Sequence, residues 1–158
     1  MAELNIIEGD FKLEDVSVGL IASRFNGFIV QSLVDGAVDV LTRQLSSSSP
    51  YDLVYVPGAL ELPLAAQAMA SKGTYDALVV LGAVIRGSTP HFDLVAAESA
   101  KGLSQVALQH NIPVINAILT TNSIEQAIER AGTKAGNKGS EAAMGALEMV
   151  SLLRKLNG

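Results

Sequence analysis

The stretch Ala77-Leu-Val-Val-Leu-Gly-Ala-Val-Ile85 is apolar from its first residue to its last. An unbroken apolar run of this length predicts a β-strand that is covered on both faces, because a strand with one face in water would alternate apolar and polar residues. Further apolar runs predict strands at Val16–Ala22, Leu53–Val56 and Pro113–Leu119. Strands of this kind are typical of a parallel sheet.

Stretches with helical periodicity separate the predicted strands. Apolar residues recur at helical spacing in Phe28–Leu45, and Ser123-Ile-Glu-Gln126 has the pattern of a capping box that opens a short helix to Arg130. The other predicted helices are Leu62–Ala70, Phe92–Gln109 and Ser140–Leu156. Ser46–Pro50 is interpreted as a linker and Gly132–Gly139 as a flexible loop. The alternation predicts an α/β three-layer sandwich, in which a parallel sheet has helices on both faces.

The composition indicates a globular protein with a single domain over residues 1–158. Apolar residues make up 49% of the chain and charged residues 17%, so the chain can bury a sizeable core. The net charge of −5 argues against binding to nucleic acids or membrane surfaces, which attract basic proteins. The absence of cysteine excludes disulfide bonds and zinc–thiolate clusters. The first residues, MAELNIIEGDFKLED, lack the pattern of a secretory signal, and no apolar run reaches transmembrane length, so we expect a cytoplasmic protein.

The loops that follow the strands are the candidate site, because ligands of parallel α/β sheets bind beyond the carboxyl ends of the strands. Phe25 follows the first predicted strand, and its ring either stacks on a planar ligand or packs beneath the loop. Glu61 follows the second strand inside an apolar stretch. Its carboxylate either accepts hydrogen bonds from a ligand or caps the next helix.

The loop after the third strand contains Gly87-Ser88-Thr89, directly before a predicted helix. Backbone N–H groups and hydroxyl groups at such a place can bind a phosphate. In the P-loop motif that binds nucleoside triphosphates, a lysine is required at the position that Ser88 occupies here. We therefore exclude nucleoside triphosphates as ligands. His91 follows this loop, and it either transfers protons near neutral pH or caps the helix.

Basic side chains follow the fourth strand at Arg130, Lys134 and Lys138. Each is interpreted as a surface charge when taken alone. In combination with the Gly87-Ser88-Thr89 loop, they are candidates for phosphate binding. The residues by themselves therefore predict an enzyme or a binding protein for a small phosphorylated molecule. They do not identify the substrate.

Four segments of the sequence resemble the lumazine synthase family. They are Arg24-Phe25-Asn26, Val56-Pro57-Gly58-Ala59-Leu60-Glu61, Gly82-Ala-Val-Ile-Arg-Gly87-Ser-Thr-Pro-His91-Phe92 and Ile124-Glu-Gln-Ala-Ile-Glu-Arg130-Ala-Gly-Thr-Lys-Ala-Gly-Asn-Lys-Gly139. The segments come in the family's order and span nearly the whole chain. The resemblance implies a flavodoxin-like form of the predicted fold and a place in riboflavin biosynthesis. There the family makes 6,7-dimethyl-8-ribityllumazine from 5-amino-6-(D-ribitylamino)uracil and L-3,4-dihydroxy-2-butanone 4-phosphate.

The resemblance also implies roles for the residues of these motifs. The residues implied for the pyrimidine and its ribityl chain are Phe25, Ala59, Leu60, Glu61, Ala83, Val84, Ile85 and Asn116. The residues implied for the butanone phosphate are Ser88, Thr89 and Arg130, with Arg130 supplied by a neighbouring subunit. His91 is the implied proton-transfer residue. Neither a cofactor nor a metal ion is implied.

Two positions depart from the pattern that is commonest in the family. Ala83 stands where threonine is frequent, which matters little if the backbone makes the contact. Asn116 stands where phenylalanine is frequent, and it exchanges one apolar wall of the pyrimidine pocket for an amide. We expect this exchange to affect the affinity for the pyrimidine and not the reaction.

The resemblance further implies self-association to a pentamer. Assembly of pentamers into an icosahedral shell and binding to riboflavin synthase are further expectations to be tested. The short Gly132–Gly139 loop is of the kind that accompanies shells in the family. Two alternatives stay open beside the enzyme: a non-catalytic protein that binds lumazines or flavins, and a shell protein, whose role is compatible with catalysis. A non-catalytic binder can dispense with His91 and the phosphate loop, and this sequence retains both.

Overall fold

The computed structural model describes residues 2–45, 51–132 and 136–158. Strands and helices alternate along these ranges, as the hydrophobic pattern predicts. In chain order the elements are β1 (Val18–Ser23), α1 (Gly27–Gln44), β2 (Tyr51–Val56), the short 3₁₀ helix η1 (Ala59–Glu61), α2 (Leu62–Ser71), β3 (Ala77–Ile85), α3 (His91–His110), β4 (Val114–Thr121), α4 (Ile124–Arg130) and α5 (Lys138–Asn157). None of the helices in the described ranges is both long and apolar enough to cross a membrane.

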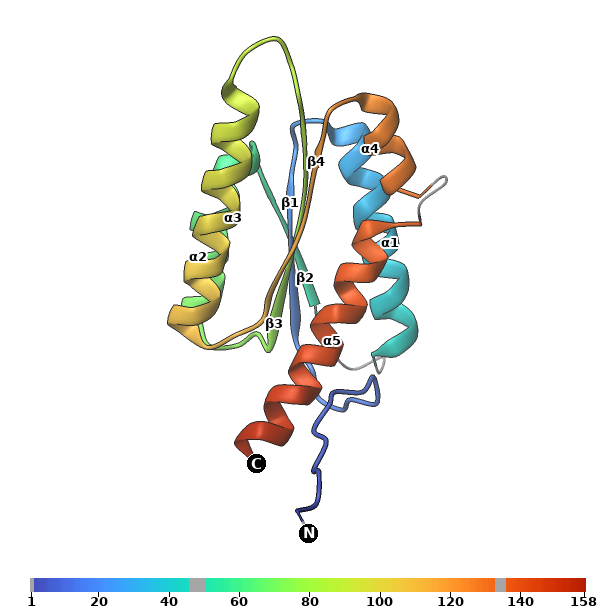
Figure 1. The fold of residues 1–158 in the computed structure, drawn as a ribbon, viewed down its shortest axis with the longest axis vertical. Coiled ribbons are helices and arrows are strands. Elements are labelled where there is room, and N and C mark those ends of the chain that lie inside the picture. Colours follow the sequence, from blue (N-terminus) through green and yellow to red (C-terminus); the bar gives the residue numbers. More distant parts are fainter. Residues whose placement is uncertain (1, 46–50, 133–135) are drawn as a thin grey trace.

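The strands form a parallel sheet in the order β2-β1-β3-β4. β3 pairs with β1 on one side and with β4 on the other, and its residues from Ala77 to Val84 are all buried. Helices α2 and α3 cover one face of the sheet, and α1, α4 and α5 cover the other (Figure 1). The predicted α/β three-layer sandwich of flavodoxin-like type is therefore confirmed.

Alternate residues of the strands pack into two cores, one on each face of the sheet. Leu20 and Leu81 pack on the face covered by α1 and α5, together with Leu147 of α5. Ile21 and Val80 pack on the opposite face. Because burying a side chain of this size stabilises a fold by roughly 1.5–3 kcal/mol, both faces of the central strands hold the helices in place.

Some boundaries differ from those predicted from the sequence. The helix α5 begins at Lys138, so the prediction that Lys138 and Gly139 belong to a flexible loop is wrong. The reason is a cap, since the side chain of Asn137 accepts a hydrogen bond of 3.0 Å from the amide of Ser140. The sequence does not predict the short helix η1, which forms part of the connection between β2 and α2. The predicted linker Ser46–Pro50 lies outside the described residues.

The predicted capping box of α4 is present in part. The hydroxyl of Ser123 accepts a hydrogen bond of 3.2 Å from the amide of Gln126, as predicted. The side chain of Gln126 accepts a bond of 2.8 Å from the amide of Asn122 instead of that of Ser123. The start of α4 is therefore tied to the loop that follows β4.

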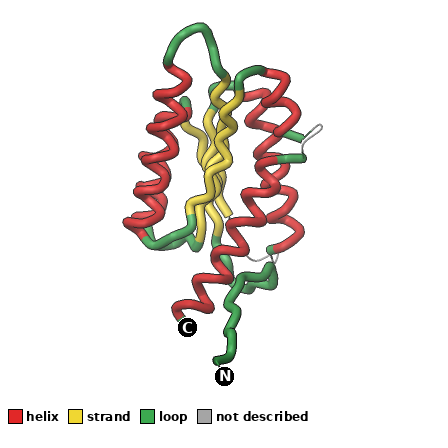
Figure 2. The backbone as a smooth tube through the Cα atoms, in the orientation of Figure 1, coloured by secondary structure: helices red, strands yellow, loops and turns green. Residues whose placement is uncertain are grey.

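The carboxyl ends of the strands lie at the same edge of the sheet because the strands are parallel. Figure 2 shows the loops that leave this edge, at the end of the molecule opposite to both termini. The loops that the sequence singles out as candidate site therefore lie together in space.

Candidate active site

A cavity of about 390 Å³ lies at the carboxyl edge of the sheet, between the loops after β1 and β2, the end of β3 and the start of α3. The predicted site residues that line it are Phe25, Ala59, Leu60, Glu61, Ala83, Val84, Ile85, Thr89 and His91. These residues come from separate segments of the chain, and the parallel sheet brings their segments to one place.

The loop after β1 places Phe25 at this cavity. Asn26 adopts the left-handed backbone conformation (φ 58°), which asparagine tolerates better than most residues. Its side chain donates a hydrogen bond of 2.9 Å to the carbonyl oxygen of Ala83, and the amide of Phe25 donates one of 3.1 Å to the carbonyl of Pro57. Phe25 is 71% exposed, so it does not pack beneath the loop and its ring is open to a planar ligand.

Glu61 ends η1 directly before α2. It occupies the N-cap position of α2, but its side chain makes no capping hydrogen bond to the described part of that helix. A Cβ atom at Gly58 would lie 3.3 Å from Oε1 of Glu61, so the glycine leaves room for the carboxylate. Because Glu61 also lines the cavity, a ligand-binding role is favoured over a role as helix cap.

The start of α3 forms another wall of the cavity. His91 is the first residue of the helix, and it lines the cavity together with Gly87 and Thr89 of the preceding loop. Pro90 occupies the N-cap position, so the alternative interpretation of His91 as the helix cap is wrong. An anion bound here would meet the N-terminus of a long helix, where backbone N–H groups and the helix dipole stabilise negative charge.

Three predicted site residues, Ser88, Asn116 and Arg130, do not line the cavity in the described chain. Asn116 lies on the edge strand β4 and lines a separate hollow beside Ala96 and Ala100 of α3. The expectation that Asn116 forms a wall of this cavity therefore does not hold within one chain. Arg130 ends α4, which covers the face of the sheet opposite to α3 (Figure 1). Its supply by a neighbouring subunit stays a prediction.

Some lining residues are absent from the predicted set, among them Asn26, Phe92 and Val95. Phe92 and Val95 lie three positions apart on α3, so they share the face of the helix that is turned to the cavity. Phe92 has a signal in the sequence, since it follows His91 at the start of a predicted helix. The contact of Asn26 with Ala83 has no such signal, because it joins the loop after β1 to a separate strand, β3.

The cavity lacks a strong cation of its own. Among the lining residues in the described ranges, none is lysine or arginine. Its ionisable side chains are the carboxylate of Glu61 and the imidazole of His91. Within the same ranges, no group of three or more histidine, aspartate or glutamate side chains is arranged to hold a metal ion. Among the features of this described lining, the N-terminus of α3 favours an anion.

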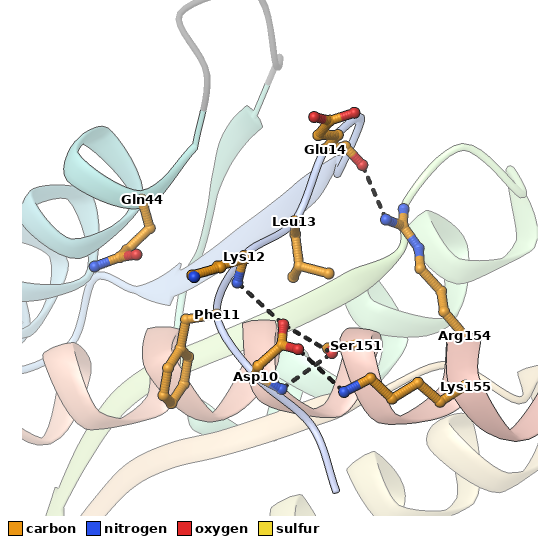
Figure 3. A pocket seen from close by; sticks show the side chains of 9 residues that line it. All are labelled: Asp10, Phe11, Lys12, Leu13, Glu14, Gln44, Ser151, Arg154 and Lys155. Carbon is orange, nitrogen blue, oxygen red and sulfur yellow. Dashed lines mark hydrogen bonds and ion pairs between the residues drawn. The ribbon is translucent and has the colours of Figure 1, made fainter.

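A larger cavity, of about 750 Å³, lies between the segment before β1 and helix α5 (Figure 3). The Nζ atom of Lys155 lies 3.0 Å from Oδ2 of Asp10, and the amide of Asp10 donates a hydrogen bond of 3.0 Å to Oγ of Ser151. The hydrogen bond from Lys155 lowers the pKa of Asp10 below its ordinary value. These contacts fasten the segment to α5. Since the predicted site residues line the smaller cavity instead, size does not identify the active site here.

The comparison with protein families agrees with the motifs and with the cavity. The family described as 6,7-dimethyl-8-ribityllumazine synthase matches residues 15–154, a range that contains every residue lining the smaller cavity. The members of this family are transferases of riboflavin biosynthesis. A match over this much of the sequence shows that the chain belongs to the 6,7-dimethyl-8-ribityllumazine synthase family.

Proposed function

We propose that this chain condenses 5-amino-6-(D-ribitylamino)uracil with L-3,4-dihydroxy-2-butanone 4-phosphate to give 6,7-dimethyl-8-ribityllumazine, phosphate and water. The observation that carries the proposal is one cavity lined by Phe25 of the loop after β1, Glu61 at the end of η1 and His91 at the start of α3. An aromatic ring, a carboxylate and an imidazole suit stacking on a pyrimidine, binding of ribityl hydroxyls and proton transfer. The ribityl chain is assigned to Ala59, Leu60 and Glu61.

Main-chain groups at the end of β3 suit the polar edge of the pyrimidine. Within the described strands, the pairing of β3 with β1 ends at Leu81, whereas the pairing with β4 continues to Ile85. Successive residues of a central parallel strand turn their N–H and C=O groups to opposite neighbours. The carbonyl of Ala83 points away from β4 to Asn26, and the same alternation directs the main chain of Ile85 toward the cavity side. Backbone contacts of this kind tolerate alanine at position 83.

The proposed reaction depends on proximity and proton transfer. The 5-amino group of the pyrimidine attacks the ketone of the butanone phosphate, and loss of water gives a Schiff base. Elimination of phosphate forms an enol, which tautomerises to a ketone, and the ribityl-bearing amine closes the ring with loss of water. The proton transfers are assigned to His91, which lines the cavity. Holding two reactants in the right geometry is worth up to roughly 7–11 kcal/mol, and this route requires neither a cofactor nor a metal.

The phosphate is assigned to the start of α3, with Ser88 and Thr89 as donors and Arg130 of a neighbouring subunit as the cation. Two observations support this assignment: the described cavity lining contains no lysine or arginine, and Arg130 stands at the exposed end of α4. The active unit would then be an assembly, at least a pentamer. A shell of pentamers, riboflavin synthase as partner, a single domain over residues 1–158 and a cytoplasmic location stay predictions.

Incubation of the protein with both substrates, followed by the absorbance of the lumazine product, tests the proposal. We expect product formation well above the uncatalysed rate, and a large loss of it in His91→Ala. Omission of the butanone phosphate is the control. Binding of the pyrimidine without accelerated product formation would contradict the proposal and support the non-catalytic binding protein.

A mixing experiment tests the shared site. His91→Ala and Arg130→Ala proteins should each be impaired, and subunit exchange between them should restore part of the activity, because some sites then combine an intact His91 with an intact Arg130. Exchange is verified separately with labelled subunits. Failure to recover activity after verified exchange would contradict a site completed by a neighbour.

A further inference from the structure

The start of α3 carries two residues of the cavity, His91 and Phe92, but it has no side-chain cap within the described chain. Its N-cap residue is Pro90, whose side chain cannot accept a hydrogen bond. The first N–H groups of a helix have no partner inside the helix, so an uncapped turn opens easily. A contact from outside α3 is therefore needed to hold this turn at the cavity.

Arg86 provides such a contact with two residues of the first turn. The central carbon of its guanidinium group lies 4.3 Å from the centroid of the Phe92 ring. Its Nη2 atom lies 3.5 Å from Oδ1 of Asp93. A planar guanidinium group can lie on an aromatic face while its N–H groups donate within its own plane. Phe92 lines the cavity and Arg86 does not, so Arg86 supports the ring from outside the ligand site.

Arg86 is itself anchored to the end of β4 and to the loop that follows it. Its amide donates a hydrogen bond of 2.8 Å to the carbonyl of Thr121, and its Nε atom donates one of 2.9 Å to Oδ1 of Asn122. The amide of Asn122 in turn donates to the side chain of Gln126 in α4. Thr121 is buried, so the anchor belongs to the packed part of the sheet. Arg86 therefore connects the first turn of α3 to β4 and α4.

We propose that Arg86 is a positioning residue of the active site, which holds Phe92 and His91 at the cavity by bridging the start of α3 to Asn122. The catalytic consequence rests on the proposed function of His91, whereas the bridge itself does not. Lysine is a poor replacement for Arg86. Its single ammonium group cannot lie on the Phe92 ring and at the same time donate a hydrogen bond to Asn122, as a planar guanidinium group can.

Hydrogen–deuterium exchange of the assembled protein tests the bridge without any substrate. Arg86→Ala should speed amide exchange in residues 94–97 by about tenfold or more, because their amides donate to the carbonyls of the first turn and lose protection when that turn opens. Exchange in residues 103–110 should stay unchanged. Arg43→Ala is the matched control, since it removes the same charge from an exposed ion pair of 3.1 Å with Asp39. Unchanged exchange in residues 94–97, or an equal increase along the whole of α3, would overturn the proposal.

Steady-state kinetics test the consequence for the reaction. Arg86→Ala should lower kcat by about 10–100-fold, the range expected when reacting groups are misplaced by about 1 Å. Asn122→Ala should also lower kcat, and Asn122→Asp, which keeps an oxygen acceptor for Nε of Arg86, should recover much of that loss. The double variant Arg86→Ala/Asn122→Ala should lose no more than Arg86→Ala alone, because the two residues act as one unit.

The two measurements separate the bridge from the proposed function. If the unaltered protein makes no lumazine, the proposed function is rejected. Faster exchange in Arg86→Ala would still support the bridge in that case. Normal turnover by Arg86→Ala, or losses that add fully in the double variant, would overturn the positioning role and leave the proposed function intact.

Discussion

The side-chain amide of Asn26 donates a hydrogen bond of 2.9 Å to the main-chain carbonyl oxygen of Ala83. The bond joins the loop after β1 to the end of β3, and both residues line the cavity. Asn26 has a φ of 58°, a conformation that asparagine adopts at lower cost than most residues. The backbone conformation and the hydrogen bond together set the position of Phe25.

Replacement of Asn26 with glycine should remove the hydrogen bond and keep the loop conformation, because glycine adopts positive φ without strain. We expect Asn26→Gly to lower the free energy of unfolding by about 0.5–1.5 kcal/mol and to weaken pyrimidine binding. Asn26→Asp should lose more of both, since it sets a carboxylate against the Ala83 carbonyl. Denaturant titration and calorimetric titration measure the two effects. Equal behaviour of the glycine and aspartate variants would contradict the role given to this bond.

Removal of the Phe25 ring should weaken pyrimidine binding. If the ring stacks on the pyrimidine, Phe25→Ala costs roughly 1–3 kcal/mol of binding free energy, the range known for stacking of bases on aromatic side chains. Phe28→Ala is the matched control, because Phe28 is 81% exposed and does not line the described cavity. Calorimetric titration with each substrate measures the effect. An equal loss for both substrates would mean that Phe25 supports the loop instead.

Arg130 and His91 should give opposite kinetic signatures. Arg130→Ala removes a charged hydrogen-bond donor from the phosphate, so the KM for the butanone phosphate should rise by the equivalent of about 1.5–3 kcal/mol, with the pyrimidine KM nearly constant. His91→Ala should mainly lower kcat, by about 10²–10⁴-fold if proton transfer limits the rate. Steady-state kinetics of the assembled variants distinguish them. A fall in kcat alone for Arg130→Ala, with a rise in phosphosugar KM alone for His91→Ala, would show that the two roles are reversed.

Two glycines of α5 should respond in opposite ways to substitution by alanine. A Cβ atom at Gly139 would lie 2.0 Å from the main-chain oxygen of Leu33 in α1, so Gly139→Ala should destabilise the fold by roughly 1–3 kcal/mol. At Gly145, apart from the adjoining residues and the backbone of α5 itself, no atom of the described chain lies within 4 Å of the added carbon. Gly145→Ala should therefore stabilise the helix by about 0.5–1 kcal/mol. Urea denaturation measures both. Similar values for the two variants would contradict the close contact of α5 with α1.

The free energy of unfolding should fall at high pH as Tyr75 ionises. The Tyr75 hydroxyl donates a hydrogen bond to Asp52, and this bond, with a smaller contribution from burial, raises the pKa of Tyr75 from 10.0 to about 12. The fold therefore favours the neutral phenol. This contribution is fully present below pH 10 and is lost as the pH rises through about 12.

Urea denaturation across this pH range compares the protein with Tyr75→Phe, which cannot ionise at that position. The free energy of unfolding of the unaltered protein should fall more steeply with pH than that of the variant. Parallel curves would contradict a coupling between Tyr75 ionisation and folding.

The central strand could be predicted from the sequence, because a strand that is buried on both faces consists of an unbroken apolar stretch. The apolar stretch Ala77–Ile85 predicts a strand over the same residues that form β3. The start of α5 could be predicted only in part, because asparagine is a common helix cap but its contact with α1 is not local. It begins at Lys138 because Asn137 caps the helix and also donates a hydrogen bond of 2.8 Å to the carbonyl of Ser32 in α1. That contact joins residues far apart in the chain, and no local pattern encodes it.

The sequence by itself determined the alternation of strands and helices. It also placed Phe25, Glu61 and His91 in the connections that follow the strands, which a parallel sheet must bring together at one edge. These features follow from side-chain polarity and periodicity, which are local properties of the chain. Only the tertiary structure decided the strand order β2-β1-β3-β4, which makes β4 an edge strand and leaves Asn116 outside the cavity. It also decided that Arg86 lies against Phe92. Neighbours of this kind depend on how separate elements pack, and the sequence specifies them only through the energy of the whole fold.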